Sequence, residues 1–79
     1  MSRWQAIQVA VVAGKPQRFR WRRQWHRVAH ILEQWQDQGA WWAGESPCWF
    51  FRVGVEGGGV FEVASDLAKR QWWLYRVYD

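Results

Sequence analysis

The chain of 79 residues has little of what disulfide-stapled, metal-dependent and membrane-spanning proteins are built from. Cys48 is its only cysteine, so neither a disulfide within the chain nor a zinc site of several cysteines can form. The two histidines, His26 and His30, have no evident third ligand, and we expect no metal site. The apolar run at residues 9–13 is far too short to cross a bilayer. These absences predict a cytoplasmic protein without cofactor, metal or membrane contact.

Patterns of catalytic residues are also missing. Acidic and histidine side chains are few and scattered, so neither a nucleophilic triad nor a pair of catalytic carboxylates can be argued. Gly57, Gly58 and Gly59 are followed by Val60, whereas a phosphate-binding loop requires Lys and then Ser or Thr at the start of a helix. A lone cysteine such as Cys48 is more often a small buried apolar residue than a nucleophile. We therefore expect no catalytic residue and no enzyme activity.

Negative charge is absent from the first 32 residues, and this makes the charge distribution uneven. Residues 1–32 hold seven cations and no acid, a charge of +7. Residues 33–79 hold four cations and seven acids, so 4 − 7 = −3, and the total is +4. A basic segment of this kind predicts attraction to phosphates. The alternative is that the arginines only solvate an aromatic-rich surface.

Tryptophan is what the chain has in excess, with nine residues. A domain near this size buries only about 60–65% of its unfolded surface, and each buried aromatic removes about 150–250 Å² from water. Several tryptophans are therefore expected at the surface, beside the arginines that alternate with them. The candidate nucleic-acid-binding residues are Arg18, Arg20, Arg22, Arg23, Trp25, Arg27, Trp41 and Trp42.

Each part of this set also has a purely structural interpretation. Phe19 and Trp21 alternate with arginines, so they can belong to the core of a strand whose other face is solvated. Trp41 and Trp42 fall in an expected loop at residues 36–47, where they could close one end of the fold instead of stacking on bases.

Most of the chain has the pattern of short β-strands. β-Branched and aromatic residues gather in five segments, at residues 6–12, 18–22, 49–55, 60–64 and 72–78. The glycine-rich residues 56–59 predict a hairpin turn between two of them. In the last segment, Trp73, Tyr75 and Val77 share one side, and we expect Trp73 to face the core.

Residues 26–36 fit two structures. A stripe of helical spacing runs through Val28, Ile31, Leu32 and Trp35. A strand would split this stripe unless a bulge re-aimed one pair, but no good N-cap precedes Trp25, so we favour a bulged strand. On a strand, His26 and His30 would share a side. The predicted fold is one domain, residues 1–79, all-β, an antiparallel meander of five or six strands coiled into a sheet or small barrel. The alternative is α+β with a helix at about 26–36.

Motifs of fairly specific spacing run through nearly all of the chain from Pro16 onward. They comprise Pro16, Arg18, Phe19 and Trp21; Val28, Ile31, Leu32 and Trp35; Gly39, Trp41, Trp42, Gly44 and Glu45; Phe51, Arg52 and Val53; Gly58, Phe61, Glu62 and Val63; Asp66, Trp73 and Leu74; and Arg76, Val77, Tyr78 and Asp79. In these residues the chain resembles an uncharacterised family of short, tryptophan-rich bacterial domains, a domain of unknown function. It departs from the family at Arg23, where members prefer Gly, and at His26, where they prefer Tyr.

This family is similar to segments associated with error-prone, Y-family-type DNA polymerases. The resemblance implies a context of DNA repair or translesion synthesis, and it transfers no catalytic or binding residue.

The charge, the tryptophans and the resemblance together predict a non-catalytic binding module. Its expected partner is single-stranded or forked DNA, near a DNA polymerase or a related repair protein. The alternative is an adaptor whose exposed Trp and Arg side chains dock on a protein or on a second copy of the chain.

Overall fold

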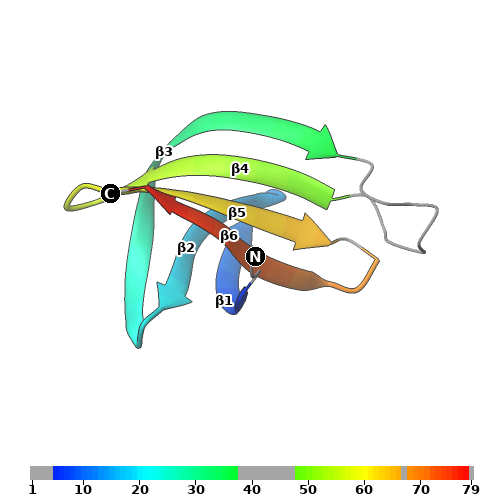
Figure 1. The fold of residues 1–79 in the computed structure, drawn as a ribbon, viewed down its shortest axis with the longest axis horizontal. Helices are drawn as coiled ribbons and strands as arrows, with labels where there is room; N and C mark the ends of the chain where they lie inside the picture. Colours follow the sequence, from blue (N-terminus) through cyan, green and yellow to red (C-terminus); the bar gives the residue numbers. More distant parts are fainter. Residues whose placement is uncertain (1–4, 38–47, 67, 79) are drawn as a thin grey trace.

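The structure is a computed structural model, and it describes residues 5–37, 48–66 and 68–78. In this part of the chain there are six strands and no helix. The strands are β1 (Gln5–Val12), β2 (Lys15–Trp21), β3 (Gln24–Asp37), β4 (Cys48–Val55), β5 (Val60–Asp66) and β6 (Gln71–Tyr78). Each strand pairs antiparallel with the next, and β6 pairs back with β1 to close a barrel (Figure 1). The all-β prediction and the small barrel are confirmed.

Strand β3 resolves the ambiguity at residues 26–36 in favour of the bulged strand. It bends over the barrel, so that its first part lies beside β2 and its second part beside β4 (Figure 1). The register with β4 shifts between Val28 and His30 and again between Ile31 and Glu33. These bulges turn Val28 and Ile31 together onto the core, which explains how a strand acquires helical spacing.

One consequence of the first bulge corrects an expectation about the histidines. His26 pairs with Phe19, and its ring stacks on that of Phe19 at a centroid distance of 5.4 Å, on the core side. His30 lies opposite Gly54 and is exposed. The two histidines therefore do not share a side, because the extra residue Ala29 reverses the alternation between them.

The core is formed by inward-facing side chains from every strand except β3, whose Val28 and Ile31 pack against its edge. Its buried members are Ile7, Phe19, Phe51, Val53, Val55, Phe61, Val63 and Leu74. The core-facing residues of β4 are Phe51, Val53 and Val55, and those of β5 are Phe61 and Val63, which alternate along each strand. In β5 the outer face is buried as well, so all residues from Phe61 to Asp66 are buried. Burying these aliphatic and aromatic groups provides the main driving force for closing the barrel.

Strand β6 corrects the expectation for the paired tryptophans. Its register against β5 shifts so that Val63 pairs with Leu74 while the neighbouring Glu62 pairs with Arg76, which leaves Tyr75 as an extra residue. Trp72 packs against the core and Trp73 lies on the opposite face, paired with Ala64. Trp72, and not Trp73, is the core tryptophan. The strict alternation assumed from the sequence fails at this bulge.

The β4–β5 and β2–β3 turns both use backbone conformations with positive φ. Gly57, Gly58 and Gly59 adopt φ of 88°, 98° and 101° in the β4–β5 hairpin, which confirms the predicted glycine turn. The β2–β3 hairpin turns on Arg22 and Arg23, with φ of 52° and 65°. Two successive residues with positive φ are typical of the tight type I′ turn, in which Asn and Gly are preferred.

The expected loop at residues 36–47 begins later than predicted, because β3 continues to Asp37. Trp41 and Trp42 lie outside the described residues. No helix capable of crossing a bilayer occurs in the ranges that the structure describes.

Candidate nucleic-acid interface

The register of the β2–β3 hairpin brings four of the predicted binding residues onto one outer face. Arg18 lies directly opposite Arg27, and Arg20 lies directly opposite Trp25. Phe19 between the two arginines of β2 is fully buried, so those arginines point away from the core. We call Arg18, Arg20, Trp25 and Arg27 the arginine face. Residues two apart on a strand are separated by about 6.6 Å, so the guanidinium groups form an extended row.

Trp25 provides a flat apolar surface within the arginine face. The residue is 50% exposed, so about half of a large apolar surface remains accessible to a ligand. The Arg18 guanidinium carbon lies 5.1 Å from the centre of the Trp25 ring, close enough for a cation–π contact. An unpaired base could therefore stack on an indole that is already flanked by positive charge.

The tip of the same hairpin adds two more arginines. Arg22 and Arg23 both have positive φ, a conformation that costs a residue with a Cβ about 1–2 kcal/mol relative to glycine. The Arg22 guanidinium carbon lies 4.4 Å from the centre of the half-buried Trp21 ring. The tight turn at Arg23 is therefore present although glycine, which the turn favours, is not.

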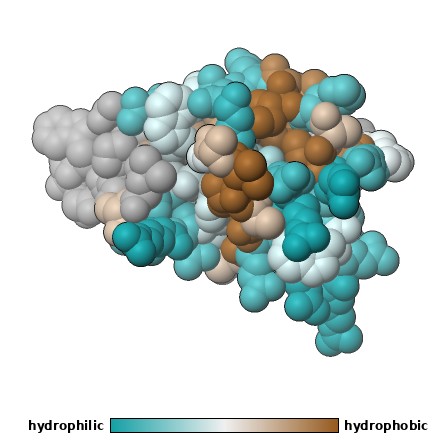
Figure 2. Space-filling view, turned by 180° about the vertical axis from the view of Figure 1, so that it is seen from behind, coloured by the Kyte–Doolittle hydropathy of each residue, from teal (hydrophilic) through white to brown (hydrophobic). Residues whose placement is uncertain are grey.

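Little negative charge opposes these arginines among the residues that the structure describes. The ion pair found there joins Arg27 Nε to Glu56 Oε2 at 4.0 Å, with both side chains more than 60% exposed. Such an exposed pair contributes about 0–1 kcal/mol. Arg18 and Arg27 are like charges directly opposite each other, an arrangement that destabilises a sheet. In Figure 2 the hydrophilic surface extends onto the projecting β2–β3 hairpin.

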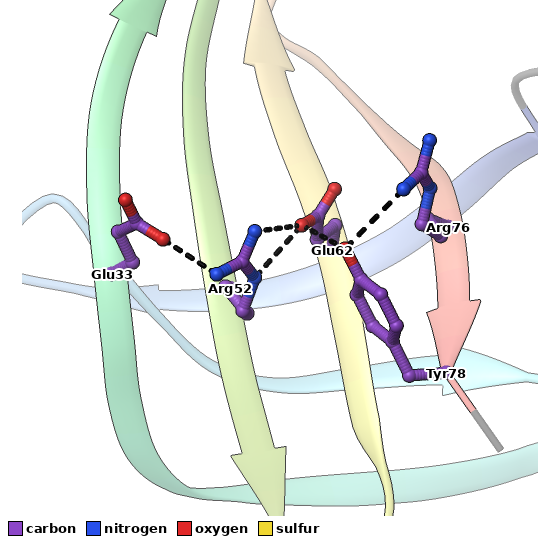
Figure 3. A network of polar contacts seen from close by, with 5 residues as sticks. All are labelled: Glu33, Arg52, Glu62, Arg76 and Tyr78. Atoms are coloured by element: carbon purple, nitrogen blue, oxygen red, sulfur yellow. Dashed lines mark hydrogen bonds and ion pairs between the residues drawn. The ribbon is translucent and has the colours of Figure 1, made fainter.

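A second group of charged residues, on the outer face of strands β3 to β6, was missed by the sequence reasoning (Figure 3). Arg52 Nη1 donates to Glu33 Oε1 at 2.6 Å, and Arg52 Nε donates to Glu62 Oε2 at 2.8 Å. The Tyr78 hydroxyl donates to the same Glu62 oxygen at 2.6 Å. Arg76 Nη1 reaches the Tyr78 oxygen at 3.5 Å. We call Glu33, Arg52, Glu62, Arg76 and Tyr78 the polar network.

The polar network satisfies its own charges. The Glu62 side chain is only 3% exposed, and its carboxylate is held by Arg52 and Tyr78. The hydrogen bond to Glu62 is the main cause that raises the pKa of Arg52, and the hydrogen bond to Tyr78 is the main cause that raises the pKa of Arg76. Raised pKa values mean that both arginines are held in their charged form. This arrangement joins the four strands β3 to β6.

A signal for part of this network is present in the sequence. The alternation that buries Phe51, Val53, Phe61 and Val63 requires a register in which β4 and β5 match these residues in pairs. That register necessarily sets Arg52 opposite Glu62 on the outer face. Arg76 and Tyr78 could not be added, because the bulge at Tyr75 decides which way they point.

Metal binding finds no support in the geometry. Within residues 5–37, 48–66 and 68–78, no three His, Cys, Asp or Glu side chains come together in a way that could hold an ion. Cys48 is half-buried at the start of β4.

The chain matches a known protein family. A family model described as a domain of unknown function (DUF6504) matches residues 4–79, nearly the whole chain. No curated protein and no solved structure matches the chain significantly.

Proposed function

Because the chain belongs to the DUF6504 family, whose description names no activity, we propose its function from the chemistry of the arginine face: it is a non-catalytic module that binds single-stranded or forked DNA. The observation that carries this proposal is the direct opposition of Arg18 to Arg27 beside an exposed Trp25. Like charges opposed across a hairpin reduce stability by about 0.2–1 kcal/mol. A phosphate bound between Arg18 and Arg27 would attract both guanidinium groups, so the same pair would then favour the bound state.

The contrast between the two charged groups supports the proposal. In the polar network Arg52 has acidic partners on both neighbouring strands, Glu33 on β3 and Glu62 on β5, so its charge needs no ligand. On the arginine face, among the described residues, the acidic partner is Glu56, which lies 4.0 Å from Arg27, at the limit of ion-pair distance. Guanidinium groups match phosphate oxygens in bidentate geometry, which makes a phosphate backbone the fitting partner for the arginine face.

Single-stranded DNA fits this surface better than a duplex. Proteins that bind single strands combine a basic track for the backbone with aromatic rings on which unpaired bases stack. The arginine face provides both, since Trp25 stands in the same row as Arg20. In a duplex the bases already stack on one another and would not reach the indole.

The proposal is tested by titrating the protein with a fluorescently labelled oligothymidylate. Wild-type protein should bind at low salt, and the variant Arg18→Glu with Arg20→Glu should lose more than about tenfold in affinity. The matched control is Lys69→Glu with Arg70→Glu. It reverses the same number of charges in the β5–β6 turn, at the opposite end of the barrel from the β2–β3 tip (Figure 1).

If both charge-reversed variants lost affinity equally, the effect would come from net charge and not from the arginine face. If the wild-type protein did not bind at low salt, nucleic acid would be excluded as the partner. The stacking role is tested by Trp25→Ala, for which we expect a loss of about 1–3 kcal/mol in binding. Leu32→Ala is its control, because Leu32 is similarly exposed, at 54%, and lies outside the arginine face.

We place this binding in the context of DNA repair, beside a lesion-bypass polymerase or a related repair protein. The resemblance of the chain to segments associated with Y-family-type polymerases supports this context. A polymerase at a lesion works next to unpaired template, which is the ligand that the arginine face suits. Copurification of the protein with such a polymerase, dependent on forked DNA, is the corresponding test.

A protein contact through β1 is the second candidate. Val11 and Val12 are 44% and 56% exposed, and hydrophobic surface is gathered on the face of the molecule that carries β1 (Figure 2). Exposed apolar patches of sufficient area mark contacts between proteins. Val11→Ser with Val12→Ser should then abolish association measured by sedimentation. A monomer at all concentrations, with no partner retained, would exclude this role.

A further inference from the structure

An open pocket lies between the β2–β3 tip and the second half of β6. Its volume is about 390 Å³, within the range of small-ligand sites. It is lined by Gln5, Trp21, Arg22, Leu74, Tyr75, Arg76 and Val77. Two arginines and two aromatic residues line it, and no carboxylate does. The lining therefore favours an anionic ligand with an aromatic ring.

The two arginines approach the pocket from different strands and retain donors for a ligand. Arg76 is exposed, and its hydrogen bond to the Tyr78 oxygen is long, at 3.5 Å, so most of its five N–H groups remain available. Arg22 lies against the Trp21 ring, which holds its guanidinium plane at the pocket wall. Two guanidinium groups match a phosphate monoester, which carries a charge of about −1.5 to −2.

The backbone of the β2–β3 tip is the second observation. A type I′ turn is cheapest with Asn or Gly, yet this chain places Arg22 in it at a φ of 52°. Backbone strain of this kind persists where the surrounding structure or function requires the side chain. Ala13, Arg23 and Arg70 also have positive φ, and Arg22 is the residue of these four that lines the pocket.

We propose that this pocket binds a nucleotide bearing a phosphate monoester, with the base against Trp21 and Tyr75 and the phosphate between Arg22 and Arg76. As the terminal nucleotide of a bound strand, it would sit where the row of Arg18 and Arg20 ends, and in that form the inference rests on the proposed function. A free mononucleotide presents the same chemistry, and the experiment separates the two sources.

The experiment compares oligothymidylates of one sequence with a 5′-phosphate, a 3′-phosphate or neither. We expect one phosphorylated form to bind about five- to tenfold more tightly than the unphosphorylated strand. Arg76→Gln should remove this preference, so that the phosphorylated and unphosphorylated strands bind the variant with equal affinity. The control is Arg70→Gln, an exposed arginine in the β5–β6 turn, which should keep the preference.

A second measurement, by NMR, leaves Arg22 and Arg76 unchanged. Thymidine monophosphate, but not thymidine, should shift the indole N–H resonance of Trp21, assigned from the spectrum of Trp21→Phe. Binding of the unphosphorylated strand without any phosphate preference or Trp21 shift would overturn the pocket and leave the proposed function standing. A Trp21 shift without binding of any strand would overturn the proposed function and establish a mononucleotide site. Absence of both would overturn both.

Discussion

Glu62 shows how a single buried charge can be retained on the outside of a barrel. Its carboxylate is almost fully shielded from water, and it accepts hydrogen bonds from Arg52 and Tyr78. A buried carboxylate without such partners would cost several kcal/mol, so each partner matters more than an exposed ion pair does. The residue that appears from sequence to be a surface acid is therefore a structural one.

Removal of one hydroxyl tests this role. Tyr78→Phe deletes the donor at 2.6 Å and leaves the ring in place, so we expect a loss of about 1.5–3 kcal/mol in the free energy of unfolding. Urea denaturation with an unchanged m-value provides the measurement. If Tyr78→Phe unfolded at the same urea concentration as wild type, the hydrogen bond to Glu62 would contribute nothing to stability.

At the β2–β3 tip we expect a substitution to raise the stability of the protein. Arg23 has a φ of 65°, so Arg23→Gly should raise the stability by about 1 kcal/mol and at the same time weaken DNA binding. Arg20→Gly is the matched control. It removes the same side chain from extended backbone within β2, and should lower both stability and binding. A fall in stability on Arg23→Gly would mean that this side chain makes contacts worth more than the backbone strain.

At the scale of the element, bulges decide which side chains meet. The sequence was sufficient to place five strands, the glycine hairpin and the buried Phe19, because these follow from strict alternation and turn chemistry. It was not sufficient for Trp72 or His26, because each lies near a bulge and a single extra residue exchanges the two faces. The outer face of β2 was predictable because β2 has no bulge against β3.

Deletion of Leu32 tests this view of β3. Leu32 is the residue skipped in the register with β4, so its deletion leaves Ile31 opposite Val53 and Glu33 opposite Arg52 in a regular ladder. Glu33 would keep Arg52, and Trp35 would keep its stacking on Phe50 at 5.4 Å, so we expect the deletion variant to fold. Leu32→Ala, which keeps the bulge, should cost less than about 1 kcal/mol. Circular dichroism and thermal melting provide the measurement, and an unfolded deletion variant would mean that the barrel requires the bend that this bulge gives β3.

At the scale of the whole molecule, charge is divided between the polar network, whose two arginines and two glutamates balance, and a hairpin whose arginines have little opposing charge among the described residues. The salt dependence of DNA binding should therefore reflect the hairpin alone. With about three to five phosphates contacted, the logarithm of the affinity should fall with the logarithm of salt concentration with a slope of about −2 to −3.5. Arg52 should not contribute to this slope, because its partners Glu33 and Glu62 already balance it.

Glu56 provides a prediction of gain. It is the acid that approaches the arginine face, 4.0 Å from Arg27, and it would compete with a phosphate for that guanidinium. Glu56→Gln should raise the affinity for single-stranded DNA by about two- to fivefold at low salt, and the gain should vanish at high salt. Glu33→Gln removes the same charge within the polar network and is the comparison. If both variants gained equally, long-range charge rather than the contact with Arg27 would be responsible.

The joint between β1 and β6 has a consequence for how the protein is made. Three residue pairs close the barrel there among the described residues, and they join Gln5 to Leu74, positions that lie 74 − 5 = 69 apart in the chain. Pairing over such a distance slows folding. During synthesis β1 leaves the ribosome long before β6, so the edge of β1 that pairs with β6 has no partner until the end of the chain is made. Two nascent chains that meet in that interval could pair edge to edge. Synthesis rate and chain spacing on the messenger therefore bear on the yield of closed barrels.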